Sequence, residues 1–212
     1  MIDLVEIMHE LSVHRPIFHS EFDFQHALAW QINTLVPACK IRLEYPFGEN
    51  REKHLDILVF GNDWKVAIEL KYRTTDIFVV SEEELFILKG HSANDQGRYQ
   101  FWGDVARVEE FVSQYPGTIG YSIMLTNDSG YWNPGNKVAP IDKEFRLTEG
   151  GVVTGKLNWA ELAAPGSIKG METTISLKGN YACNWRDYSE FQPDKYVQGR
   201  LKFRYLIVET NL

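Results

Sequence analysis

Cysteine is scarce in this chain, and metal-binding histidine patterns are missing. Among 212 residues only Cys39 and Cys183 are cysteines, too few for a disulfide framework or a cysteine-based zinc site. The six histidines form no H-x-x-x-H or H-E-x-x-H pattern, which excludes the common zinc-protease helix. G-x-G-x-x-G, Walker and G-x-S-x-G motifs are also absent, which argues against nucleotide-binding and α/β-hydrolase folds. We expect a protein of a reducing, cytoplasmic environment.

Long apolar runs and an excess of positive charge are missing as well. No stretch approaches the roughly 20 apolar residues of a membrane helix, and acidic residues interrupt the N-terminal segment where a secretory signal would be apolar. We therefore expect no membrane contact. Lysine and arginine number 22 against 29 aspartates and glutamates, a net charge of −7, so no chain-wide basic field attracts nucleic acid. Any contact with a polyanion must be local.

The residues that are present have the composition of an ordinary globular protein. The chain is 44% apolar and 24% charged, and its length suits a single domain with a real core. We expect one domain over 1–212, with a core at about 18–127 and a final strand at 201–210. The segment at about 128–200 is rich in Gly, Asn, Ser, Pro and aromatic residues, which indicates a β-rich insertion.

Hydrophobic periodicity predicts the elements of this core. A helix over 21–35 has Ser20 at its cap, and its apolar stripe includes or adjoins Glu21 and Gln25. A second helix is predicted over 95–112. Strand patterns cover 40–47, 54–60, 64–72, 118–126 and 201–210. The order predicts an α/β fold of the type α-β-β-β-α-β, with a mixed central sheet flanked by helices.

Shorter segments are less regular. The apolar runs 77–80 and 85–88 flank an acidic stretch, which predicts either a hairpin or a strand followed by a loop. The triplet 149–151 lies between 145–148 and 152–159 and predicts a second hairpin. Aromatic and basic residues alternate after residue 180, either as a surface that binds nucleic acid or as core aromatics with a solvated basic rim.

The strongest chemical signal is three charged residues on two neighbouring strands. Asp56 lies in 54–60, and Glu69 and Lys71 share one face of 64–72, a run that is otherwise apolar on both faces. An antiparallel pairing of the two strands brings Asp56 close to Glu69. These carboxylates and the Leu70 carbonyl are hard oxygen donors suited to Mg²⁺, with Mn²⁺ as a substitute. Glu21, pointing from the first helix toward the sheet, adds a ligand directly or through water.

Such a set suits phosphodiester hydrolysis, in which a metal polarises a phosphoryl oxygen and acidifies a bound water. Lys71 either stabilises negative charge on the phosphate as an ammonium or, if burial lowers its pKa, deprotonates the attacking water. The alternative is a structural ion cluster on a sheet face. Three charges together with an inward Glu21 favour the metal site, because unpaired buried charge is costly.

The order of helix with Glu21, strand with Asp56, strand with Glu69-Leu70-Lys71, helix and strand resembles the PD-(D/E)XK nuclease superfamily, which has the restriction-endonuclease-like fold. The resemblance covers roughly 20–127 and extends to the final strand, and 86–111 is similar to a pattern in bacterial members. It implies that Asp56 and Glu69 are metal ligands, that Lys71 is the catalytic lysine and that Glu21 is the helix acid of the site.

Residues near this motif are candidates for substrate binding. The resemblance places Gln25, one turn after Glu21, in the wall of the pocket. His54 precedes Asp56 by two residues on the same strand face, where it either contacts substrate or is structural. The chain departs from the superfamily's name motif at Leu55, where proline is usual.

The second predicted helix carries further candidates. Arg98 either reaches a phosphate or pairs with Asp95 or Asp104 on its own helix. Gln96 and Tyr99 are additional substrate-binding candidates. Asp104 and Arg107 are one turn apart, a spacing that predicts an ion pair on the helix surface.

The resulting hypothesis is a metal-dependent nuclease acting on DNA, with RNA as the less favoured substrate. The alternative is a catalytically silent module that keeps this fold to bind nucleic acid or a partner protein, which the net charge of −7 favours. Two carboxylates in a tryptophan-rich chain also fit glycoside hydrolysis, a chemistry that does not need Lys71. The pattern leaves open a homodimer or a larger assembly.

Overall fold

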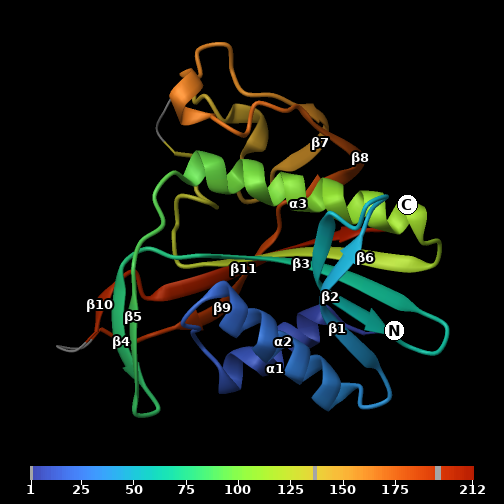
Figure 1. Cartoon of the computed structure of the whole chain (residues 1–212). Coiled ribbons are helices and arrows are strands. Elements are labelled where there is room, and N and C mark those ends of the chain that lie inside the picture. Colours follow the sequence, from blue (N-terminus) through green and yellow to red (C-terminus); the bar gives the residue numbers. More distant parts are fainter. Residues whose placement is uncertain (1, 136–137, 194–196) are drawn as a thin grey trace.

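The computed structural model describes residues 2–135, 138–193 and 197–212, and it has a mixed α/β architecture (Figure 1). Helices α1 (Leu4–His14) and α2 (Glu21–Leu35) cover one face of a central sheet, and α3 (Asn94–Gln114) covers the other. Apolar side chains of β2 and β3 alternate between the two faces: Ile57 and Ile68 pack toward α2, whereas Leu58 and Ala67 pack toward α3. The sheet is therefore covered on both sides.

The central sheet has six strands in the order β1-β2-β3-β6-β11-β9. The first three form an antiparallel meander, β3 and β6 run parallel, and β11 is antiparallel to both of its neighbours. The mixed sheet and the addition of the last strand confirm the sequence-based expectation. The strands are β1 (Lys40–Phe47), β2 (Lys53–Phe60), β3 (Lys65–Arg73), β6 (Thr118–Thr126), β9 (Trp185–Glu190) and β11 (Lys202–Thr210).

The helices have clear local causes. The Ser20 hydroxyl accepts a hydrogen bond from the Asp23 amide at 3.2 Å, so α2 begins where its cap predicts. Helix α1 was not predicted from the sequence. It is capped by Asp3, whose carboxylate accepts hydrogen bonds from Val5 and Glu6 at 2.9 and 3.1 Å, and it buries an apolar stripe against α2 and the sheet.

Of the two structures predicted for 77–88, the hairpin is the one that forms, and the acidic stretch makes its turn. Strands β4 (Ile77–Ser81) and β5 (Glu84–Leu88) are antiparallel, and β10 (Gln198–Gly199) adds to β4. Glu82 and Glu83 occupy the two-residue turn with φ values of 50° and 69°, as a turn of the favoured hairpin type requires. The hairpin stands beside the first turn of α2 (Figure 1).

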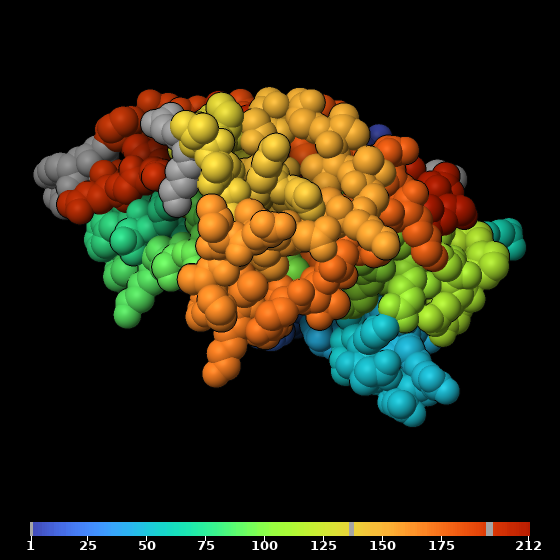
Figure 2. All heavy atoms as spheres, turned by 90° about the horizontal axis from the view of Figure 1, so that it is seen from above, coloured from blue at the N-terminus to red at the C-terminus, as the bar shows by residue number. Residues whose placement is uncertain are grey.

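A third sheet covers the side of α3 that faces away from the central sheet. It consists of β7 (Val152–Leu157) and β8 (Ile175–Ala182), and short 3-10 turns at Lys143–Phe145 and Pro165–Ser167 complete this layer. Viewed from above, the yellow and orange segments that follow β6 lie over α3 (Figure 2). Strand β9, within the segment expected as an insertion, is an edge strand of the central sheet.

The hairpin predicted at 149–151 is wrong, because β7 pairs with β8 and not with 145–148. Residues 145–148 instead insert Phe145 and Leu147 into the core beside α3. Their carbonyls accept hydrogen bonds from the indole groups of Trp102 and Trp185 at 3.0 and 2.7 Å, which replaces strand pairing. The aromatic residues after 180 are mostly core, as shown by the buried side chains of Tyr181, Trp185, Tyr188, Phe203 and Tyr205.

Within the described ranges, no helix has both the length and the apolar character needed to cross a membrane.

Candidate active site

The candidate site lies where β2 and β3 separate. Their pairing runs from Phe60 with Lys65 to Ile57 with Ile68 and then ends. Beyond this point, two carboxylates supply the hydrogen-bond acceptors for β3. The Leu70 amide donates to Asp56 Oδ2 at 2.5 Å, and the Tyr72 amide donates to Glu21 Oε2 at 2.7 Å.

This arrangement explains how residues from a strand and a helix meet. Amides two residues apart point to the same edge of a strand, so Leu70 and Tyr72 hold Asp56 and Glu21 side by side. The amides would otherwise lose their partners as the strands diverge. The structure thus brings Glu21 and Asp56 to β3 beside Lys71.

Glu69 faces α3 and is buried, with 2% of its surface exposed. Its Oε2 atom accepts a hydrogen bond from Arg107 Nη1 at 2.8 Å. Its other oxygen, Oε1, is buried and has no hydrogen-bond partner among the described residues. One carboxylate oxygen of Glu69 is therefore available to a further ligand.

Lys71 is held by carboxylates from two helices. Its Nζ atom lies 3.0 Å from Asp104 Oδ2 on α3 and 3.9 Å from Glu21 Oε1 on α2. It also donates a long hydrogen bond of 3.4 Å to the Leu70 carbonyl. Asp104 is buried, and its Oδ1 atom lies 3.3 Å from Arg107 Nη2. The ammonium of Lys71 is thus fixed between the two layers of helices.

Asp104 and Arg107 form the ion pair that their spacing predicts, but the pair belongs to this site and does not lie on the exposed surface of the helix. Asp104 is 3% exposed, and each residue binds a charged side chain of β3 in addition to its helix neighbour. The sequence contained one signal of this role. Asp104 lies next to Val105 and three residues after Phe101 on the apolar stripe of α3, where a charge needs a partner.

The cluster has more acidic than basic groups. If all six groups are ionised, four carboxylates face two cations, and the net charge is −2. Burial and neighbouring negative charge make ionisation of the acids unfavourable. The members are Glu21, Asp56, Glu69, Lys71, Asp104 and Arg107.

The carboxyl pKa values reflect this excess. Burial, with the charge of Asp104, raises the pKa of Asp56 to about 6, although the hydrogen bond from Leu70 opposes the change. Burial and the charges of Asp104 and Asp56 raise the pKa of Glu69 well above its usual range against the opposing effect of Arg107. Burial also raises the pKa of Asp104. A cation bound here would relieve this repulsion.

Lys71 behaves in the opposite way from a lysine that acts as a base. Burial by itself would lower the pKa of Lys71, but the charges of Asp104 and Glu21 outweigh it, and the pKa lies above its usual value. The side chain is therefore an ammonium at neutral pH. Of the two roles considered for Lys71, this favours charge stabilisation and argues against deprotonation of water.

The donor chemistry of the site fits a hard divalent cation. Among the described residues, no three His, Cys, Asp or Glu side chains form a group arranged to hold a metal ion. The available oxygens are nevertheless of the right kind, from the Asp56 carboxylate, the Leu70 carbonyl and the unpartnered Oε1 of Glu69. With all six groups ionised, the excess of two negative charges equals the charge of one such cation.

Gln25 lies beneath the site and does not line its opening. Its Nε2 atom donates to the Asp56 carbonyl at 2.8 Å and to Glu44 Oε1 at 2.7 Å. Glu44 on β1 has a φ of 49°, an uncommon conformation for a residue that is not glycine. Gln25 thus ties α2 to the strand segment that carries Asp56, which is a positioning role.

Three candidates on α3 lie on the other side of that helix. Arg98 is buried in an ion pair with Asp142 and donates to the Gly130 carbonyl at 2.7 Å. It therefore pairs with the segment after β6 and not with Asp95 or Asp104. Gln96 and Tyr99 also bind this layer, since their side chains donate to the carbonyls of Ser167 and Thr173 at 2.8 and 2.9 Å.

His54 also stays apart from the cluster. It is exposed on β2 opposite Pro46, and within the described ranges it has no hydrogen bond or ion pair with the acidic residues of the site.

Comparisons with known proteins return no match to this chain among family models, curated proteins or solved structures.

Proposed function

We propose that this protein is a metal-dependent nuclease with a restriction-endonuclease-like core, and that it hydrolyses phosphodiester bonds in DNA. RNA is the alternative substrate. The observation that carries the proposal is the acidic excess around Lys71 where β2 leaves β3. Asp56 and Glu21 are held there by strand amides, and one buried oxygen of Glu69 has no hydrogen-bond partner among the described residues.

The proposed cation is Mg²⁺, or Mn²⁺ in its place, held by Asp56, Glu69 and the Leu70 carbonyl. Glu21 would contribute through water, because one of its oxygens already accepts from Tyr72. A bound divalent ion supplies a Lewis acid for the phosphoryl oxygen and an acidified water for attack.

The protein's own residues position charge around the reacting phosphate. Lys71, kept protonated by Asp104, stabilises the negative charge that grows on the phosphate oxygens during attack. Arg107 holds Glu69 in place through one oxygen and leaves the other open. Asp104 and Arg107 are positioning residues in this scheme, since they act through Lys71 and Glu69.

The test is calorimetric titration of Mn²⁺ and Mg²⁺ into the wild type and the double variant Asp56→Asn, Glu69→Gln. A matched control is Asp63→Asn, Glu161→Gln, which removes the same charge from exposed positions elsewhere. We expect metal binding in the wild type and control, and its loss in the site variant. All three proteins are then incubated with plasmid and single-stranded DNA, and only those that bind metal should cleave.

A second function, a silent nuclease-fold module, is favoured by two specific observations. Glu69 and Lys71 already have partners within the chain, and no three-residue metal group is preformed in the described ranges. Absence of metal binding even at millimolar Mn²⁺, with no cleavage, would support this module and contradict the nuclease. A pull-down with nucleic acid and with cell extract would then identify what it binds.

A further inference from the structure

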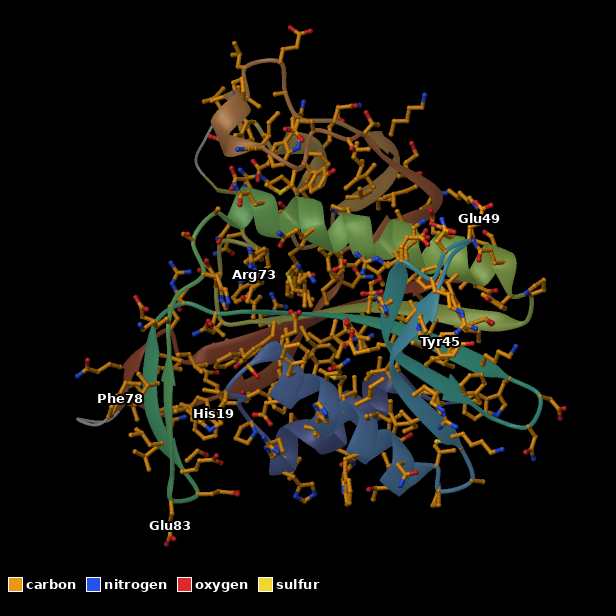
Figure 3. All side chains as sticks on the ribbon, viewed as in Figure 1. His19, Tyr45, Glu49, Arg73, Phe78 and Glu83 are labelled. Carbon is orange, nitrogen blue, oxygen red and sulfur yellow. The ribbon has the colours of Figure 1, made fainter. Side chains whose placement is uncertain are left out.

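A pocket of about 410 Å³ opens beside Lys71 and contains basic groups that the cluster does not use. It lies between the first turn of α2, the end of β3, strand β5 and the segment that follows β5. In Figure 3, Arg73 lies at the α3 side of this region and His19 beside the β4–β5 hairpin. The basic side chains that line it, apart from Lys71, are His19, Arg73, Lys89 and His91.

The wall that carries Lys89 and His91 is fastened to the end of β3. The His91 amide donates to the Thr74 carbonyl at 2.8 Å, and the Thr74 amide donates to His91 Nδ1 at 3.0 Å. The Gly90 amide donates to Asp76 Oδ1 at 2.8 Å. Because Nδ1 accepts a hydrogen bond, a neutral His91 carries its proton on Nε2 and can donate to a ligand.

The two longer cations of the pocket, Arg73 and Lys89, have no acidic partner among the residues that the structure describes. Within the described ranges neither Arg73 nor Lys89 forms an ion pair, and Arg73 donates only a long hydrogen bond of 3.4 Å to the Tyr131 hydroxyl. Most of the Arg73 guanidinium donors therefore have no hydrogen-bond partner in the described part of the chain. In a chain with a net charge of −7, such a local group of cations is suited to an anion.

We propose that this pocket is a phosphate-binding subsite that holds a phosphate of the substrate strand next to the scissile one. The inference rests on the proposed function, because Lys71 and Glu21 line the same pocket. Arg73 and Lys89 bind the phosphate oxygens, and His91 donates through Nε2. The charges of Arg73 and Lys89 offset the repulsion between the acidic cluster and the backbone of the strand.

The walls of the pocket also suit one strand of nucleic acid. Ile87 lines it with 61% of its surface exposed, which offers an apolar contact for a sugar or base beside the bound phosphate. A cavity of this volume lies within the range that takes small ligands, so it has room for one nucleotide unit of a strand.

The test compares the double variant Arg73→Gln, Lys89→Gln with the control Arg42→Gln, Lys169→Gln, which removes two exposed charges elsewhere. Binding of a labelled single-stranded DNA oligonucleotide is measured by fluorescence anisotropy over a KCl series. Ca²⁺ replaces Mg²⁺ so that a cation can offset the carboxylates. We expect the pocket variant to bind about tenfold more weakly, with a salt slope reduced by about 1.4 for two lost contacts to a single strand.

Equal affinity and equal salt slope in the pocket and control variants would overturn the subsite, as would absence of binding by the wild type. Circular dichroism of each variant establishes that it is folded. Cleavage in Mg²⁺ is measured in parallel. Strand binding that depends on Arg73 and Lys89 without cleavage would retain the subsite and remove the nuclease, whereas cleavage and binding indifferent to both residues would do the reverse.

Discussion

Lys71 shows how a single charge is set by its surroundings. It is largely buried, yet Asp104 at 3.0 Å and Glu21 at 3.9 Å keep it protonated. An ammonium at a fixed position needs no rearrangement when charge develops on a nearby phosphate. The residue is therefore expected to act in the reaction and to add little to metal binding.

The first prediction concerns this ammonium. Lys71→Ala should reduce the cleavage rate by about 10² to 10³, the usual cost of losing one fixed group that stabilises transition-state charge. The variant should keep its fold and its Mn²⁺ affinity. Single-turnover cleavage and calorimetry on the same preparation measure both quantities. Full activity would remove Lys71 from the proposed mechanism.

The second prediction distinguishes the role of Asp104 from that of Lys71. Asp104→Asn removes the charge that raises the pKa of Lys71, so that pKa should fall. NMR titration of the lysine side-chain carbons would record the shift directly. Cleavage should fall less than in Lys71→Ala, because the ammonium is still present at neutral pH. An unchanged Lys71 pKa would contradict a positioning role for Asp104.

The third prediction concerns Asp56 in metal-free protein. Its pKa is higher when folded, about 6 against 3.8, so the folded state binds more protons between these values. Its contribution is therefore fully present below about pH 4 and is lost as the pH rises through about 6. The change amounts to about 3 kcal/mol.

Urea denaturation in EDTA from about pH 4 to about pH 7 tests whether the stabilising contribution of Asp56 is lost as the pH rises. The difference in unfolding free energy between wild type and Asp56→Asn should shift in favour of the variant as the pH rises. A difference that stays constant over this range would show that the Asp56 pKa is not raised in the folded protein.

At the scale of elements, α3 lies between the central sheet and the β7–β8 sheet, and it directs different charged side chains toward each of them. Asp104 and Arg107 face β3, whereas Glu109 faces the β7–β8 sheet. Glu109 is 1% exposed and accepts hydrogen bonds from the amides of Lys178 and Gly179, both at 2.8 Å, and from the Tyr181 hydroxyl at 2.6 Å. This carboxylate fixes β8 to the helix.

The fourth prediction follows from these bonds. Glu109→Ala leaves three donors of β8 without their acceptor and should lower the free energy of unfolding by about 3 kcal/mol. Glu161→Ala, at an exposed position of the same layer, should change it by less than about 0.5 kcal/mol. Equal stability of the two variants in urea would show that Glu109 does not anchor the layer.

Element prediction succeeded where the pattern was long and local. The helix over 21–35 and the strands over 40–47 and 118–126 have the bounds that their periodicity and caps predict. Prediction failed at 145–148, a segment with a strand-like pattern that forms no strand pair. Its side chains Phe145 and Leu147 pack in the core beside α3 instead. The indole donors of Trp102 and Trp185 take the carbonyls that a hairpin would use, and no local pattern reports such distant partners.

At the scale of the whole molecule, an acidic net charge is compatible with the proposed activity because the basic groups of the pocket are gathered in one place, apart from most of the acidic surface. The cations that a nucleic acid would contact lie in one pocket next to the carboxylate cluster. The rest of the surface can stay acidic without preventing local contact, since fields between exposed charges are screened within about 10 Å at ordinary salt.

The sequence alone determined the fold class, most elements of the core and four members of the cluster, which are Glu21, Asp56, Glu69 and Lys71. Periodicity, caps and the alternation of β3 are local properties, and they place Glu69 and Lys71 on one face whatever lies opposite. Only the tertiary structure decided which residues face Glu69 and Lys71. The packing of α3 on β3 adds Asp104 and Arg107, and the divergence of β2 from β3 turns Asp56 and Glu21 toward free amides. It also directs Arg98 to Asp142, because a buried charge pairs with whichever opposite charge packing brings near.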